Sequence, residues 1–423
     1  MYTIQNTNMK QYFIMAAMLL CHTSGAWAQE ILTLRNVLDK IDSSNPVSRM
    51  YDAQIRSSEA AAKGAYSWEA PQVGGGFWMV PYLTKYIYTK NGEVGMGQFM
   101  LSAQQMFPNK TKQDAQANYL KALSSVDKEK KKAALNDVYA NAKKYYYLGL
   151  ISKKKLTVIS ESEKVLTFML KSAEISFKNN VGSLNAYYKA EAALGNLKNT
   201  RLVVERDITQ AQIALNTLMN RNRSPFEVDT SYVIRDYMAS EFDTSRLVSS
   251  RSDIKALERS SELSRLQQVN ERAGILPEVS VRFDHMIGLG GLPMQYNLQA
   301  MVKIPISKSS RAAKATIESL HWKDEALQQE RQLLINDISG MAFSIQNDIG
   351  SKKKQLLLFK EQIIPSLRKN FQVIQLNYEQ NTGQLFELYD AWEALNNVQL
   401  TYTDLLKDLL SLQVDLERIL EIK

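Results

Sequence analysis

Stretches with a helical hydrophobic period alternate along this chain with stretches of period two. Apolar residues recur at helical spacing from Leu34 to about Ser67 and again from Ser252 to Ala273. The first stretch is expected to break near Asn45-Pro46, because Pro cannot continue the hydrogen bonding of a helix interior. We therefore predict a helix ahead of each of the two segments where the period changes.

Both period changes follow a Pro and predict strand pairs, over residues 71–107 and 277–306. The second is the more regular, because apolar and polar residues alternate strictly and give one apolar and one polar face. The apolar set of its first strand is Val279, Val281, Phe283, His285 and Ile287. A transmembrane barrel requires strands of this kind, although an amphipathic hairpin on a soluble core has the same alternation.

Two long helical hairpins are predicted over residues 110–220 and 309–422. No Pro occurs from Lys110 to Lys178, which at 1.5 Å per residue predicts roughly 100 Å of helix, with Gly149 as the only strong breaker. Pro365 is expected to kink the second hairpin. A two-helix hairpin of this length cannot bury its apolar face alone, so it must pack against other copies or a partner.

The tips of the two hairpins carry the same pattern, which indicates an internal duplication. Seven residues of the first tip match seven of the second, in order and without a gap. The first set is Asn180, Gly182, Leu184, Tyr188, Ala190, Ala193 and Leu194, and the second is Asn381, Gly383, Leu385, Tyr389, Ala391, Ala394 and Leu395. The duplication extends upstream, because Pro71-Gln72-Val73 aligns with Pro277-Glu278-Val279. The Gly of each tip is expected to adopt positive φ and let the chain reverse.

The chain thus divides into a first repeat over residues 29–220, a segment over 221–250 and a second repeat over 251–423. The middle segment loses the helical period and gains Pro225 together with Ser, Thr and Asp residues, as a linker does.

Residues 1–28 have the pattern of a signal peptide: Lys10, an apolar core, and Ala26-Trp27-Ala28 before Gln29. Cys21 is the only cysteine and lies in this leader, so a mature chain would contain no disulfide. Lipidation at Cys21 is the alternative, disfavoured by the bulky Leu20.

Composition adds little chemistry. A mean hydropathy of -0.30 excludes a helical membrane protein, and a net charge of +8 spread over mixed helical surfaces does not indicate nucleic-acid binding. Beyond the leader the histidines are His285 and His321, and no nucleophile elbow or phosphate loop occurs. We expect no catalysis, cofactor or resident metal. Methionines in or near the first strand pair (Met79, Met96, Met100 and Met106) would suit soft metals, but more often fill gaps in cores and membrane faces.

The motif of an aromatic residue and Gly followed by Leu, Ala and Leu at helical spacing, present twice, resembles the TolC family of outer-membrane efflux proteins. The resemblance implies a mostly α fold with a β-barrel part. Long helical hairpins would form an α-barrel, and four transmembrane β-strands per chain would give a homotrimer a roughly 12-stranded barrel. It also implies a location in the outer membrane of a Gram-negative bacterium, contact with outer-membrane lipid, a periplasmic adaptor and an inner-membrane pump, and a middle segment packed as an equatorial belt.

The resemblance further assigns roles at the tips. Asn180, Gly182, Leu184, Asn381, Gly383 and Leu385 would dock the adaptor. Glu387 and Asp390, three residues apart and hence on one side of a helix, would form a periplasmic constriction that selects cations. The alternative is an ordinary acidic first turn favoured by the helix dipole. The first tip has Tyr187 and Lys189 nearby instead.

Three alternatives remain open. A protein-secretion exit duct of a type I system shares the channel architecture. A periplasmic adaptor normally has one helical hairpin flanked by β domains. A soluble coiled-coil scaffold does not account for the alternating strands.

Overall fold

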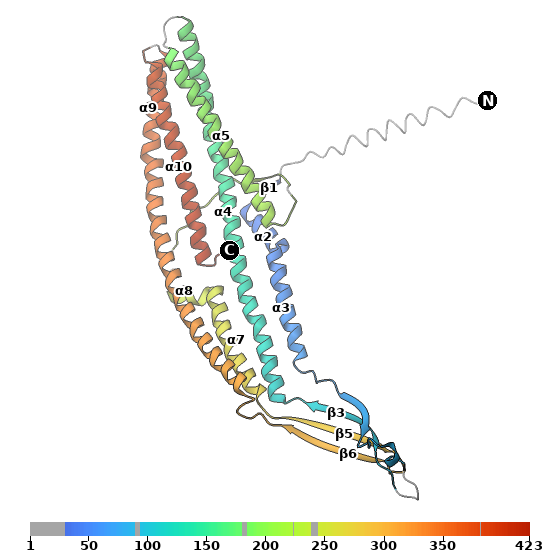
Figure 1. Cartoon of the computed structure of the whole chain (residues 1–423). Coiled ribbons are helices and arrows are strands. Elements are labelled where there is room, and N and C mark those ends of the chain that lie inside the picture. Colours follow the sequence, from blue (N-terminus) through green and yellow to red (C-terminus); the bar gives the residue numbers. More distant parts are fainter. Residues whose placement is uncertain (1–29, 89–93, 180–183, 223, 238–243, 381) are drawn as a thin grey trace, which may run out of the picture. The chain divides into compact units, whose positions relative to one another are not determined.

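The computed structural model describes residues 30–88, 94–179, 184–222, 224–237, 244–380 and 382–423. Its fold is mostly helical, as the sequence predicts, with one four-stranded and one two-stranded sheet (Figure 1). The proposed signal peptide and Cys21 lie outside the described residues.

The helices before the strand pairs are α2 (Leu34–Ser44) with α3 (Pro46–Gly64), and α6 (Thr244–Ser250) with α7 (Ser252–Gly274). The chain breaks between α2 and α3 because Asn45 is extended and its side chain accepts a hydrogen bond from the Val47 amide, while Pro46 starts the next helix.

The first long hairpin consists of α4 (Lys110–Lys178) and α5 (Leu184–Leu218). Helix α4 passes through Gly149 without interruption. A β-carbon at Gly149 would lie 3.4 Å from Cβ of Ala211 on α5 and 3.6 Å from Val228, which is ordinary van der Waals contact.

The second hairpin consists of α8 (Arg311–Leu358), a π-helical turn η4 (Phe359–Ile363), α9 (Ile364–Glu379) and α10 (Leu385–Ile419). The π turn lies directly before Pro365. Because Pro has no amide hydrogen, it cannot complete the α-helical bonding of the preceding turn, and a change to π geometry is one way a helix accommodates it.

The four-stranded sheet is antiparallel, in the order β2 (Gln72–Trp78), β3 (Gln98–Phe107), β5 (Glu278–Gly288) and β6 (Gln295–Lys303); η2 (Thr84–Tyr86) lies between β2 and β3. The two strand pairs therefore join through β3 and β5. The expected alternation of β6 to Ile306 is wrong at its end. Pro305 cannot donate to a ladder, and the strand stops at Lys303.

A short parallel ladder pairs β1 (Glu30–Leu32) with β4 (Phe226–Val228), in the register Glu30 to Phe226 and Leu32 to Val228. Strand β4 belongs to the middle segment 221–250. That segment therefore contains a paired strand in addition to irregular chain.

The chain forms two compact units, and neither follows a sequence repeat. One contains the described parts of Met1–Ser43, Ala142–Val233 and Leu356–Asp408, and the other contains those of Ser44–Asn141, Ile234–Gln355 and Leu409–Lys423. Each unit thus takes segments from both repeats. The first has a core between α4, α5 and α10 that includes Ile159, Leu166, Leu197, Leu388 and Trp392, and the second contains the four-stranded sheet.

Candidate functional site

The reversal between α9 and α10 is closed by hydrogen bonds to the end of α9. The carbonyl of Asn377 accepts from the amides of Thr382 at 2.9 Å and Gly383 at 3.1 Å. The expected positive φ at Gly383 is wrong: among the described glycines it occurs at Gly97, Gly290 and Gly291. Gly383 instead lies in a tight turn: a β-carbon there would lie 3.2 Å from Cβ of Asn377, which would have to move by a few tenths of an ångström.

The predicted tip residues are described only in part. Leu184 starts α5 with an exposed side chain, and Leu385 starts α10 half-buried. Asn180, Gly182 and Asn381 lie outside the described residues.

Glu387 and Asp390 lie in the first turns of α10, and both side chains are exposed. The opposite side of the helix is buried in the core, through Leu388, Ala391 and Trp392. The helical period thus turns both carboxylates away from the core, as expected of residues three apart on one side of a helix.

Asp390 is paired across the two hairpins, a contact that the sequence did not predict. The Nζ of Lys189 on α5 lies 2.9 Å from Oδ1 of Asp390. The same ammonium lies 3.8 Å from the ring centroid of Phe386 and 4.1 Å from that of Tyr389. One cation is therefore held by a carboxylate and two aromatic faces. Glu387 forms no ion pair within the described part of the chain.

Tyr389, on the same turn as the two carboxylates, belongs to the buried core. Burial raises the pKa of its phenol, and the carboxylates of Glu393 and Asp390 raise it further. The phenol therefore stays neutral at physiological pH.

The four-stranded sheet has one apolar face whose side chains are exposed. Register partners Phe283 and Leu298 lie side by side on it, with exposed fractions of 45% and 66%, and Phe283 also stacks on Tyr296 at 6.4 Å between ring centroids. On β2, the exposed fractions of Val73 and Phe77 are 78% and 72%. A face this apolar and this exposed in a single chain indicates contact with something other than water.

The other face of the sheet is polar and carries paired charges. Glu278 lies 2.6 Å from Nζ of Lys112 and 3.5 Å from Nζ of Lys303, and Arg282 pairs with Asp284 at 2.8 Å. His285 lies on the apolar face, where its register partner is Tyr296.

Within the described ranges, no group of three or more His, Cys, Asp or Glu side chains is placed to hold a metal ion. None of the helices that the structure describes is both long and apolar enough to cross a membrane.

No family model matches the sequence, and no curated protein matches it. Solved structures do resemble it over nearly its whole length. The outer membrane protein VceC of Vibrio cholerae has a TM-score of 0.73 at 15% identity, covering 92% of this chain and 95% of that one.

Two further structures are similar in the same way. The MtrE outer membrane channel of Neisseria gonorrhoeae, in its open state, has a TM-score of 0.71 at 15% identity, with 92% and 88% of the two chains covered. The CmeC outer membrane channel of Campylobacter jejuni has a TM-score of 0.71 at 13% identity, with 92% and 85% covered. At these identities the likeness concerns the fold, and the chain has the fold of the TolC-type outer-membrane efflux channels.

Proposed function

We propose that this protein is a passive outer-membrane exit duct of a Gram-negative bacterium, extending into the periplasm and conducting small molecules such as drugs or metals from a tripartite efflux pump. The observation that carries the proposal is the exposed apolar face of the four-stranded sheet in a chain with the fold of outer-membrane channels. That face would contact outer-membrane lipid, and the polar face would line the lumen.

Four strands cannot close a barrel around a lumen, so the proposal includes assembly. Three chains would contribute roughly 12 strands, within the size range of transmembrane barrels. The long hairpins would pack side by side into the periplasmic tunnel, which would cover the apolar positions left exposed on single helices, among them Leu202 on α5 and Leu333 on α8.

The acidic turn of α10 would narrow the periplasmic entrance. Three copies of Glu387 and Asp390 would form a ring of carboxylates that favours cations. In support, both side chains are exposed on the side of α10 away from the core. Lys189, which pairs with Asp390, would moderate the ring's negative charge.

The turns beside Leu184 and Leu385, with Asn180, Gly182, Asn381 and Gly383, would dock a periplasmic adaptor that connects the duct to an inner-membrane pump. Support comes from the exposed start of α5 at Leu184 and from the close-packed turn at Gly383.

Fractionation of cells that express the full chain, followed by its mass in detergent, tests the proposal. We expect outer-membrane fractions and the mass of three chains. A water-soluble periplasmic monomer would contradict it.

A further inference from the structure

A cavity of about 930 Å³ lies inside one compact unit, between α4, α9, α10 and the chain that follows β4. Its apolar lining comes from Leu156, Tyr232, Ile364, Tyr402 and Leu406. The volume lies in the range typical of small-molecule sites, which are largely apolar with a few polar groups that orient the ligand.

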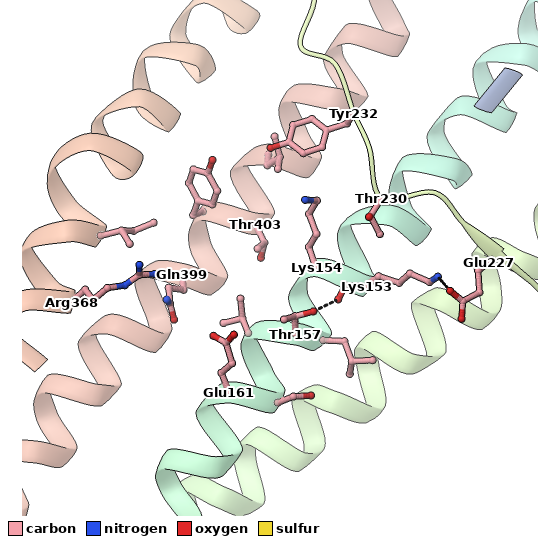
Figure 2. Close-up of a pocket in the computed structure, with 16 residues that line it drawn as sticks. Lys153, Lys154, Thr157, Glu161, Glu227, Thr230, Tyr232, Arg368, Gln399 and Thr403 are labelled. Carbon is pink, nitrogen blue, oxygen red and sulfur yellow. Dashed lines mark hydrogen bonds and ion pairs between the residues drawn. The ribbon is translucent and has the colours of Figure 1, made fainter. Parts of the chain in front are cut away.

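Two cations of the lining have no carboxylate partner. In the described part of the chain, no ion pair involves Lys154 or Arg368, whereas the neighbouring Lys153 pairs with Glu227 at 2.8 Å and Lys155 with Asp404 at 2.9 Å. Figure 2 shows Arg368 pointing from α9 toward Gln399 on α10, and Lys154 pointing toward Tyr232. The Lys154 ammonium lies 4.9 Å from the ring centroid of Tyr232.

A second hollow continues the positive charge along α9. It shares Ile364, Arg368 and Tyr402 with the cavity and adds Lys360 and Lys369, with no carboxylate in its lining. Around the joined space, the carboxylates are Glu227, already paired with Lys153, and the exposed Glu161. The local charge is therefore positive and largely uncompensated.

The π turn η4 forms part of this wall. Lys360 lies in the turn, and Ile364 and Arg368 follow it at intervals of four residues, which places all three on one side of the helix facing the shared residue Tyr402. Single π turns inside α-helices occur frequently at functional sites.

From this geometry we infer a binding site for a small amphipathic anion, a carboxylate, sulfonate or phosphate on an apolar body. Arg368 binds the anionic group, Lys154 adds to the positive charge of the lining, and Ile364, Leu406 and the tyrosine rings hold the apolar body. Charged donors to an oxyanion make strong, directional contacts. The lining residues all come from one chain, and the inference does not rest on the proposed conduction.

Isothermal titration calorimetry of the full chain in a non-ionic detergent tests the inference, with 1-naphthalenesulfonate as the anion and 1-naphthalenemethanol as its neutral analogue. We expect saturable binding of the sulfonate, at least tenfold tighter than of the alcohol. Arg368→Gln should weaken binding of the sulfonate at least tenfold and leave binding of the alcohol unchanged. Arg368→Lys should restore part of the affinity for the sulfonate. Lys198→Gln, at an exposed residue of α5 outside the cavity, changes neither.

Three results would overturn the inference. Equal affinity for the two probes would show a merely apolar hollow, and unchanged sulfonate binding by Arg368→Gln would place the anion elsewhere. If the unmodified chain does not bind the sulfonate and Arg368→Gln changes the oligomeric mass, the cations contact a neighbouring copy of the chain and not a small anion. Calorimetry measures binding and does not require conductance. The binding results can therefore be interpreted even if the channel proposal fails.

Discussion

Lys189 and Asp390 occupy equivalent positions in the two copies of the duplicated stretch and form an ion pair with each other. The offset of 201 residues that aligns Gly182 with Gly383 also aligns Lys189 with Asp390, and their Nζ and Oδ1 atoms lie 2.9 Å apart. The same aligned position on the two hairpins thus carries opposite charges. The contact ties the first turns of α5 and α10 together.

This pair predicts how charge at the tip affects ion selectivity. Lys189→Gln removes a cation beside Asp390, so the preference for cations over anions should rise, whereas Glu387→Gln with Asp390→Asn should lower it. Reversal potentials across a KCl gradient measure both. Stability should change by only about 0.2–1 kcal/mol, because both side chains of the pair are partly exposed to solvent. Lys198→Gln, farther along α5, is the control. An unchanged selectivity in both tip variants would show that this turn does not line the conduction path.

A second prediction concerns the apolar face of the sheet. Leu298→Lys places a charge on the face assigned to lipid and should cost about 2–4 kcal/mol near the middle of a bilayer. Asn297→Lys changes the neighbouring position on the polar face, opposite Asp284, and should be tolerated. The amount of each variant that is extracted from membranes and runs on a gel as a heat-resistant assembly measures its insertion. Equal assembly of the two would argue that Leu298 does not meet lipid.

The loops at the end of the sheet depend on two glycines. The Gly95 amide donates to the Gly290 carbonyl at 2.9 Å, and a β-carbon at Gly290 would lie 1.7 Å from the Ile87 carbonyl oxygen. Gly290→Ala should therefore separate the loops and increase proteolysis between β2 and β3. Gly291→Ala is a matched control, because Gly291 also has positive φ, at 86°, but faces open space; each variant carries about 1–2 kcal/mol of backbone strain. Similar proteolysis of the Gly290→Ala and Gly291→Ala variants would show that backbone strain alone, and not the clash with Ile87, causes the increase.

A pH dependence is expected at the β1–β4 ladder. Hydrogen bonding from Lys40 lowers the pKa of Glu30 below its ordinary 4.5, with Arg221 adding to the effect against the opposing influence of burial. A lowered folded-state pKa means that the stabilisation is present above pH 4.5 and is lost as the pH falls through the folded-state value. Its size is less than about 1 kcal/mol, because the carboxylate is partly exposed.

Thermal unfolding of the unmodified chain and of Glu30→Gln against pH measures this contribution. The Tm of the variant should be lower at pH 7, and the difference should close in acid. Glu191→Gln, at an exposed residue of α5, should show no such closing difference. A difference that stays constant down to strong acid would contradict the ionic origin.

The sequence predicted those features that local patterning determines. Asn45-Pro46 ends one helix and starts the next through its own cap, and the alternation of Val279, Phe283 and His285 assigns the faces of β5 without knowledge of its neighbours. Contacts between distant segments were not predictable. The Lys189–Asp390 pair and the β1–β4 ladder depend on which elements pack together, which hydrophobic period does not encode.

At Gly383 the local sequence pattern led to a wrong expectation. A glycine at a helix end suggests positive φ, yet Gly383 does not have it and lies instead where Asn377 leaves little room for a β-carbon. Duplication likewise predicted two repeats, whereas each compact unit combines segments of both. The repeats align Lys189 with Asp390 and give the two positions opposite charges, but alignment alone does not show that aligned positions are in contact.

Single-channel conductance of the purified full chain in a planar lipid bilayer tests the central claim most directly. The account predicts stepwise, stable conductance with cation preference that falls in Glu387→Gln with Asp390→Asn. Protein that assembles and inserts but conducts no ions under any applied voltage would contradict it.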